Sequence, residues 1–311
     1  MSTFETEEFT YNPSPHVPFR DKEVLERMRD IGREDFVNHP NPDLNVHVGA
    51  DFDMALDIFF RIRDAYEAGR RLVLILPQPW PVYEKVAEMI NRCNVDCHNL
   101  YTFNMDEYAD EEGNIAPESW PYGFTHALKK YFYSKIDPTL RPPEDQMIGL
   151  TNDNLEDYGK RLTDLGGADV CYMGPGWTGH VAFVEPDAPE VPQDLEEFKG
   201  WGPGLVTLSP FTLAQNSLHG SFGAAGDIAA VPPRAATIGP AQVLEAKHRI
   251  GSYTIGVAGT ATSWQKLIAR LALFGPVTPR VPDSIIQLKP SDAYVSENIA
   301  SKITVDWNKG Y

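Results

Sequence analysis

The sequence predicts an α/β fold: a doubly wound, mostly parallel sheet with helices on both faces, in a Rossmann-like arrangement. The first observation is a run of five aliphatic residues at 72–76, which is typical of a strand buried on both faces. The second is the helical spacing of apolar residues on either side of that run, at 51–68 and 82–90. Strands that alternate with helices of about 10–15 residues indicate parallel strand pairing.

The alternation continues along the chain. We expect strands at 100–103, 170–173, 205–208, 235–238, 253–257 and 285–288. We expect helices at 124–133, 155–165 and 263–274, and the second of these should end at Gly166 and Gly167, a common helix stop. Residues 45–311 are interpreted as a single α/β catalytic domain, and residues 1–44 as an N-terminal extension packed on that domain.

Composition narrows the class of partner. The 311 residues carry a net charge of -17, which argues against nucleic acid, because nucleic-acid binders present basic patches. The longest aliphatic run, at 72–76, is far shorter than the about 20 residues of a membrane span. We therefore expect a cytoplasmic protein without membrane contact.

The three cysteines Cys93, Cys97 and Cys171 are interpreted as buried thiols, since the first two lack the spacing of a usual zinc pair.

Candidate functional residues follow two of the predicted strands. In doubly wound sheets, ligands bind outside the carboxyl ends of the strands. Asp106 follows the strand at 100–103, although a helix cap or a solvated loop would also explain an Asp there. The strand at 170–173 leads into a stretch with three glycines within six residues, then His180, and Glu185 five residues later. A histidine and a glutamate beside a glycine-rich loop can form an oriented acid/base pair.

The loop at 77–81 follows a third predicted strand and has a different character. It contains three prolines, which remove three backbone N–H donors just before a helix. A helix N-terminus binds anions through free N–H groups. This loop is therefore poorly suited to bind phosphate.

Two stretches resemble the signatures of a known family, the glucosamine-6-phosphate deaminases. Residues 103–108, Phe-Asn-Met-Asp-Glu-Tyr, are similar to the first signature. Residues 174–186, Gly-Pro-Gly-Trp-Thr-Gly-His-Val-Ala-Phe-Val-Glu-Pro, resemble the second, in which a glycine-rich turn leads into Asp-Gly-His-Ile-Ala-Phe-Asn-Glu-Pro. The stretches 207–217 and 231–239 resemble the segments that follow, so the resemblance covers roughly residues 45 to 300.

The resemblance implies a reaction and a set of site residues. Members of this family open an amino-sugar phosphate ring, move a proton from C2 to C1 and release ammonia, with no metal or organic cofactor. In this chain Asp106 resembles the base that moves the proton, His180 the ring-opening acid/base, and Glu185 its carboxylate partner. The partner would be a small sugar or sugar phosphate, and the chain would form a homo-oligomer. The expected substrate contacts are Gln78, Trp80, Gly174, Gly176, Thr178 and Gly179.

The departures from the family pattern concern the phosphate and the histidine. The Asp that precedes the histidine by two residues in the family is Thr178 here, and a Gly-Gly-Thr-Pro phosphate loop is replaced by 77–81. A phosphate-contacting Arg falls at Leu213, and a phosphate-contacting Lys near Thr262. Each charge-assisted contact contributes about 1.5–3 kcal/mol. Loss of two or three would weaken phosphate binding by several kcal/mol.

Three functions fit these observations. The first is an isomerase or deaminase that acts on a sugar-like ligand without the usual phosphate contacts. The second is an amino-sugar 6-phosphate deaminase whose phosphate site is rebuilt from other residues, such as Arg234, Lys247 or Arg249. The third is a non-catalytic sugar-binding relative. Basic side chains at the pocket would favour the second function, and a neutral or apolar pocket the first.

Overall fold

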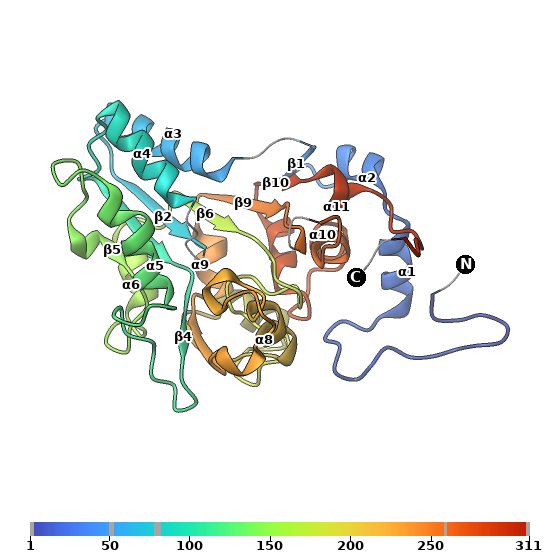
Figure 1. Cartoon of the computed structure of the whole chain (residues 1–311). Coiled ribbons are helices and arrows are strands. Elements are labelled where there is room, and N and C mark those ends of the chain that lie inside the picture. The colour runs from blue at the N-terminus through green and yellow to red at the C-terminus, as the bar shows by residue number, and fades with distance from the viewer. Residues whose placement is uncertain (1–2, 50–52, 78–81, 258–259, 309–311) are drawn as a thin grey trace.

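The structure, a computed structural model, describes residues 3–49, 53–77, 82–257 and 260–308. The predicted contacts Gln78 and Trp80 lie outside the described residues. The predicted α/β fold with a mostly parallel sheet is confirmed (Figure 1). Within the described ranges, no helix is both long and apolar enough to cross a membrane.

The main sheet has seven strands among the described residues, and every neighbouring pair is parallel. Their order across the sheet is β1-β10-β9-β6-β2-β3-β5. The strands are β1 (Leu44–Val48), β2 (Leu72–Leu76), β3 (Leu100–Asn104), β5 (Met147–Ile148), β6 (Val170–Met173), β9 (His248–Tyr253) and β10 (Ser291–Val295). The carboxyl ends of β9, β6, β2 and β3 therefore lie side by side at one edge of the sheet.

Helices cover both faces because strand side chains alternate in direction. In β2, Val73 and Ile75 join one core, whereas Leu72, Leu74 and Leu76 join the other. The second core includes residues of α3 (Met54–Glu67), α4 (Tyr83–Cys93) and α5 (Phe124–Tyr131). The first core includes residues of α2 (Arg33–Val37), α6 (Tyr158–Asp164), α7 (Leu195–Gly200), α9 (Pro240–Glu245), α10 (Gln265–Phe274) and α11 (Glu297–Ala300).

A small antiparallel sheet extends from the carboxyl end of β3. Its order is β4-β8-β7, formed by β4 (Asp106–Ala109), β8 (Arg234–Thr237) and β7 (Gly204–Thr207). Only Met105 separates β3 from β4. The segments predicted as strands at 205–208 and 235–238 are thus strands of this second sheet, because the sequence pattern identifies a strand without identifying its partner.

Two further strand predictions were wrong in detail. Residues 285–288 belong to the 3-10 helix η6 (Pro282–Leu288), whose Ile285 and Ile286 are fully buried. A short apolar run cannot be told from a buried helical turn by periodicity alone. The strand expected at 253–257 is β9, which ends at Tyr253. The remaining described elements are short: α8 (Pro210–Asn216), η1 (Tyr133–Lys135), η2 (Glu144–Gln146), η3 (Gly220–Phe222) and η4 (Ile228–Ala230).

The N-terminal segment contains α1 (Lys22–Asp30), whose Val24, Leu25 and Met28 pack with Ile268 of α10 (Figure 1). The sheet itself begins at Leu44. The boundary drawn at residues 44 and 45, and the interpretation of the preceding residues as an extension, stay predictions. The cysteines are free thiols, of which Cys97 and Cys171 are buried and Cys93 is exposed at the end of α4. The expectation of a buried Cys93 was therefore wrong, because the last turn of this amphipathic helix faces solvent there.

Candidate active site

A cavity of about 500 Å³ opens at the carboxyl ends of four neighbouring strands. Ser252 of β9 and Met173 of β6 line it. Thr254 directly after β9, Pro77 directly after β2 and Asp106 just after β3 line it as well. These are the strand ends at which a doubly wound sheet binds its ligands. The cavity is thus the candidate active site.

Asp106 is the first residue of β4 and is almost completely buried, at 7% exposed. Its Oδ1 atom is buried and has no hydrogen-bond partner among the described residues. Burial, and then the neighbouring carboxylate of Glu107, raise the pKa of Asp106 well above its ordinary value. A carboxyl group with a raised pKa can both give and take a proton near neutrality, which suits proton transfer.

Glu107 faces away from the cavity and binds the start of α5. Its carboxylate accepts from the backbone N–H groups of Tyr108 (3.0 Å), Phe124 (3.0 Å) and Thr125 (2.7 Å). Two of these belong to the first turn of α5, where N–H groups have no partner within the helix. Burial raises the pKa of Glu107, and these hydrogen bonds oppose that effect. This role as a helix cap was not predicted from the sequence.

His180 lies at the end of the glycine-rich loop and is 4% exposed. Its ring packs directly on Gly176, where an added Cβ atom would lie 2.0 Å from Nε2. Gly179 has a φ of 81°, a conformation that glycine adopts without strain. The N–H of Gly179 donates to the carbonyl of Gly176 (3.0 Å), and the N–H of Gly176 to the carbonyl of His180 (3.1 Å). The two glycines thus let the backbone fold closely around the imidazole.

Thr178 connects His180 with Glu185. Its Oγ1 donates to Glu185 Oε2 (3.0 Å) and lies 2.9 Å from His180 Nδ1. The hydroxyl has one proton, and the carboxylate can only accept, so the hydroxyl accepts a hydrogen bond from Nδ1–H. This tautomer leaves Nε2 of neutral His180 as the atom that can take a proton.

Glu185 lies behind His180 and is fully buried. Its Oε2 is 3.7 Å from His180 Nδ1, and its Oε1 accepts from the backbone N–H of Ser209 (3.1 Å). Burial by itself would raise the pKa of Glu185, yet hydrogen bonds and the interaction with His180 leave it below the ordinary value. An ionised carboxylate behind the imidazole is thus favoured near neutral pH, where it stabilises positive charge on the ring.

The predicted site residues fall into three groups. Asp106, His180, Gly174 and Gly176 line the same cavity. Thr178, Gly179 and Glu185 lie behind the residues that line the cavity, where Thr178 contacts both His180 and Glu185. Gln78 and Trp80 lie outside the described residues, although Pro77 and Val82, on either side of them, line the cavity.

Among the described residues, those that line the cavity include no cation of the kind that a phosphate requires, because none of them is Lys or Arg. The sequence segments 50–52, 78–81 and 258–259, which lie outside the described residues, also contain no Lys or Arg. The three basic residues considered for a rebuilt phosphate site lie elsewhere. Arg234 pairs with Glu190 (3.1 Å), and Lys247 pairs with Asp169 (2.8 Å) before β9 begins.

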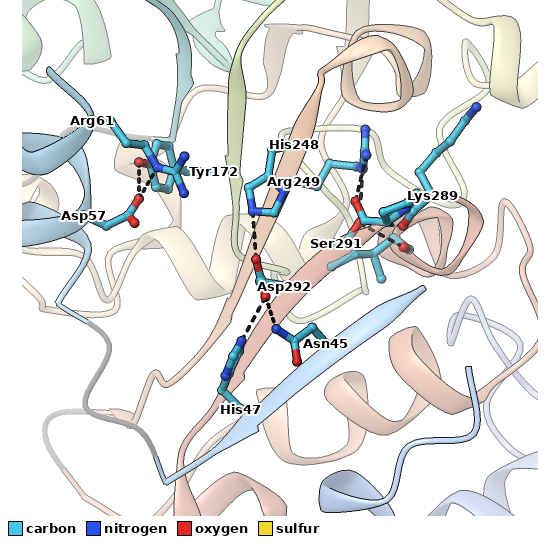
Figure 2. A network of polar contacts seen from close by, with 12 residues as sticks. Asn45, His47, Asp57, Arg61, Tyr172, His248, Arg249, Lys289, Ser291 and Asp292 are labelled. Atoms are coloured by element: carbon cyan, nitrogen blue, oxygen red, sulfur yellow. Dashed lines mark hydrogen bonds and ion pairs between the residues drawn. The ribbon is translucent and has the colours of Figure 1, made fainter. Parts of the chain in front are cut away.

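Arg249 is near the amino end of β9, at the opposite end of that strand from the cavity. It is 2% exposed and donates to Ser291 Oγ (3.1 Å) and to the carbonyl of Pro290 (2.9 Å). Figure 2 shows Arg249 beside Ser291, next to the His47–Asp292–His248 contacts on neighbouring strands. The guanidinium group of Arg249 thus makes its hydrogen bonds within the fold, away from the cavity.

Two ionisable residues near His180 were not identified from the sequence. His219 lines the cavity, and its Nδ1 is buried without a partner among the described residues. Asp283 is fully buried; it accepts from the hydroxyl of Tyr253 (2.6 Å), and its backbone N–H donates to Gly179 (2.9 Å). His219 and Asp283 each lie in a segment that has no catalytic motif. Their proximity to the glycine-rich loop is therefore visible only in the structure.

A doubly wound α/β fold with a cavity at the strand ends is the architecture of an enzyme that binds a small molecule. Two relatives agree with this class. Glucosamine-6-phosphate deaminase of Lachnoclostridium phytofermentans is 31% identical over 215 residues, which are 68% of this chain and 80% of the relative. The same enzyme of Halothermothrix orenii is 27% identical over 227 residues, 72% of this chain and 83% of the relative. The chain belongs to the glucosamine-6-phosphate deaminase family, as a divergent member, and is an enzyme of the sugar isomerase/deaminase type.

Solved structures share the fold at lower sequence identity. A structure described as a monomeric glucosamine-6-phosphate deaminase of the NagB superfamily matches with a TM-score of 0.65 and 19% identity, over 82% of this chain and 98% of the other. A 6-phosphogluconolactonase of Leishmania guyanensis matches with a TM-score of 0.54 and 13% identity, over 84% and 99%. No family model matches the chain.

Proposed function

We propose that this enzyme isomerises or deaminates an amino sugar that carries no 6-phosphate. The observation that carries the proposal is one cavity lined by Asp106 and His180 but by no described Lys or Arg. The two side chains supply proton transfer, as in the chemistry of the family, while the lining offers no counter-ion for a phosphate.

The first step is the opening of the sugar ring. Nε2 of His180 takes the proton of the C1 hydroxyl, and the same proton is returned to the ring oxygen as the C1–O5 bond breaks. The ionised Glu185, linked to the imidazole through Thr178, stabilises the positive charge that His180 carries between these events.

The second step is proton transfer between adjacent carbons. The carboxylate of Asp106 removes the proton from C2 of the open chain and returns it to C1, while the C1 carbonyl oxygen takes up a proton and the amino nitrogen gives one up. The C1 aldehyde and C2 amine thereby become a C1 alcohol and a C2 ketimine. Water then attacks C2, and the products are a ketose and ammonia. Because Asp106 is buried and its pKa is raised, its carboxylate is a stronger base than a solvated one.

The alternatives predict different surroundings for the ligand. A true 6-phosphate deaminase with a rebuilt site requires cations at the cavity, and Arg234, Lys247 and Arg249 have partners elsewhere. A non-catalytic sugar-binding relative has no need of an unpartnered, buried Asp106, which destabilises the fold. Both alternatives are therefore less well supported than catalysis on an uncharged sugar.

The cell compartment and the assembly are part of the proposal. All three cysteines are free thiols, which suits a reducing compartment such as the cytoplasm. The homo-oligomer expected from the family resemblance stays a prediction, and size-exclusion chromatography with light scattering tests it.

The test compares glucosamine and galactosamine with their 6-phosphates. Ammonia release is measured directly, and transfer of deuterium from C2 to C1 of a sugar labelled at C2 reports isomerisation even when ammonia is retained. We expect turnover of an unphosphorylated sugar that is lost in Asp106→Asn and kept in the control Asp110→Asn, whose carboxylate accepts from Glu112 and Asn114 outside the cavity. Higher kcat/KM for a 6-phosphate would overturn the substrate assignment, and no turnover of either set would favour the non-catalytic alternative.

A further inference from the structure

The cavity contains three buried polar atoms that have no hydrogen-bond partner among the described residues. They are Oδ1 of Asp106, Nδ1 of His219 and Nε1 of Trp264, and all three residues line the cavity. A buried donor or acceptor without a partner destabilises a fold by about 1–3 kcal/mol, so such atoms are usually satisfied by water or by a ligand. Asp106 has a role in the proposed reaction, whereas His219 and Trp264 have none.

The backbone fixes His219 at the edge of the cavity. Its N–H donates to the carbonyl of Asn216 (2.9 Å), at the end of α8. Its own carbonyl accepts from the N–H groups of Phe222 (3.0 Å) and Ala224 (3.0 Å). The backbone of His219 is thus held in place, and Nδ1 of its ring remains available to a ligand.

Trp264 lies directly before α10 and stacks on Trp177, with ring centroids 6.2 Å apart and an interplanar angle of 23°. The indole N–H can only donate a hydrogen bond. A neutral imidazole donates from one nitrogen and accepts at the other. Together the two side chains offer the mixture of donors and acceptors that a hydroxyl group requires, since a hydroxyl also does both.

The charge of His219 decides between a hydroxyl and a phosphate. Burial, and then the proximity of His180, lower the pKa of His219 to about 4. The ring is therefore neutral at pH 7 and provides no positive charge to an anion. No described lining residue is Lys or Arg, so a phosphate at this place would lose its water without gaining a cation.

We propose that His219 and Trp264 bind hydroxyl groups of the substrate, and that they select an uncharged sugar or polyol chain. This inference rests on the proposed function for the identity of the ligand, but it concerns recognition and not proton transfer. His219 thereby becomes a residue that determines substrate specificity in the cavity.

Binding is measured by calorimetry with 2-amino-2-deoxyglucitol, a polyol without a carbonyl or ring that cannot undergo the reaction. His219→Phe keeps an aromatic ring and removes both nitrogens, and we expect affinity to fall about 10-fold. His219→Gln retains a donor and an acceptor, so the affinity of this variant for the polyol should fall less. Trp264→Phe should also weaken binding, and His16→Phe, an exposed histidine elsewhere, should leave it unchanged. Thermal unfolding confirms that each variant is folded.

A second experiment tests whether a substitution at His219 can introduce phosphate binding. His219→Lys introduces a cation at this position, and we expect it to shift the ratio of affinities toward the 6-phosphate of the polyol by at least about 10-fold. Unchanged polyol affinity in His219→Phe and Trp264→Phe, tighter binding of the phosphate by the wild type, or no polyol binding at all would each overturn the inference.

The two proposals fail separately. If the polyol binds and His219→Phe weakens its binding, but no sugar is turned over, the reaction is wrong and the recognition stands. If sugars are turned over and KM is the same in His219→Phe, the reaction stands and the recognition is wrong.

Discussion

The hydroxyl oxygen of Thr178 lies 2.9 Å from Nδ1 of His180 and donates its only proton to Glu185. The carboxylate and the imidazole are thus coupled through a hydroxyl, with 3.7 Å between Glu185 Oε2 and His180 Nδ1. The family pattern has an Asp at position 178, so this chain keeps one carboxylate and uses the threonine to connect it. The arrangement fixes the tautomer of the histidine without adding a second negative charge.

Removal of that hydroxyl should impair catalysis with little change in shape. Thr178→Val has the same size but neither donates to Glu185 nor accepts from Nδ1, and we expect kcat to fall about 10²-fold. Thr178→Ser retains the hydroxyl and should stay within a few-fold of the wild type. Steady-state kinetics of both variants check this, and equal rates in the two would show that the hydroxyl has no catalytic importance.

Gly176 should tolerate no side chain. A Cβ atom at this position would lie 2.0 Å from Nε2 of His180, so the imidazole must move in Gly176→Ala. A displacement of about 1 Å in a reacting group reduces the rate about 10²-fold. Gly202→Ala is the matched control, because its Cβ would meet no atom within 4 Å. A Gly176→Ala enzyme as active as this control would mean that Nε2 does not take part in the reaction.

Asp106 should be important for activity and unfavourable for stability. Its Oδ1 has no partner among the described residues, and burial raises its pKa. Asp106→Asn removes the charge that burial disfavours, so we expect the free energy of unfolding at pH 8 to rise by on the order of 1 kcal/mol. Activity should fall by about 10²–10⁴-fold. Urea unfolding and ammonia release measure the two effects, and a less stable variant would show that the ionised side chain contributes to the fold.

Asp283 should make stability depend on pH. Burial raises its pKa to about 7, against 3.8 ordinarily, while the hydroxyl of Tyr253 and the proximity of His180 oppose this effect. Between these values the unfolded chain binds fewer protons than the folded one, so the stabilisation by the protonated group is lost as pH rises through 7.

Asp283→Asn cannot ionise and keeps an acceptor for Tyr253. The free energy of unfolding of this variant, taken relative to the wild type, should therefore be more favourable at pH 8 than at pH 5, by about 2.7 kcal/mol at most. Urea denaturation at the two pH values measures this difference, in which other titrating groups cancel. A difference that is independent of pH would show that Asp283 is ionised throughout.

The sequence predicted the strands at the centre of the sheet well, because five consecutive aliphatic residues at 72–76 leave little alternative to a strand buried on both faces. The prediction of strands from the sequence failed toward the C-terminus. The strand β10 has the polar start Ser291 and Asp292, while the more apolar 285–288 forms a 3-10 helix. Burial there depends on which neighbours cover the segment, and this is decided by tertiary packing.

The sequence likewise predicted some residues of the candidate site and missed others. Asp106 and His180 lie in the loops that follow predicted strands, and the rule for strand ends predicts that they lie close together. His219 and Asp283 come from segments with no local pattern, and they lie near the glycine-rich loop only because α8 and η6 pack beside it. That no described residue lining the cavity is Lys or Arg likewise depends on the whole fold, since the chain contains 27 Lys and Arg residues.

Adjacent acidic residues, Asp106 and Glu107, have separate tasks because successive side chains of a strand point in opposite directions. β4 pairs Asp106 with Thr237 and Glu107 with Ala236 of β8. A slip of one residue in this pairing would turn Glu107 into the cavity and leave the N–H groups of Phe124 and Thr125 without their acceptor. A mispaired chain would lose the start of α5 together with the catalytic acid. Correct strand register is therefore required both for the active site and for the stability of the fold, so a chain with a wrongly placed carboxylate is also unstable.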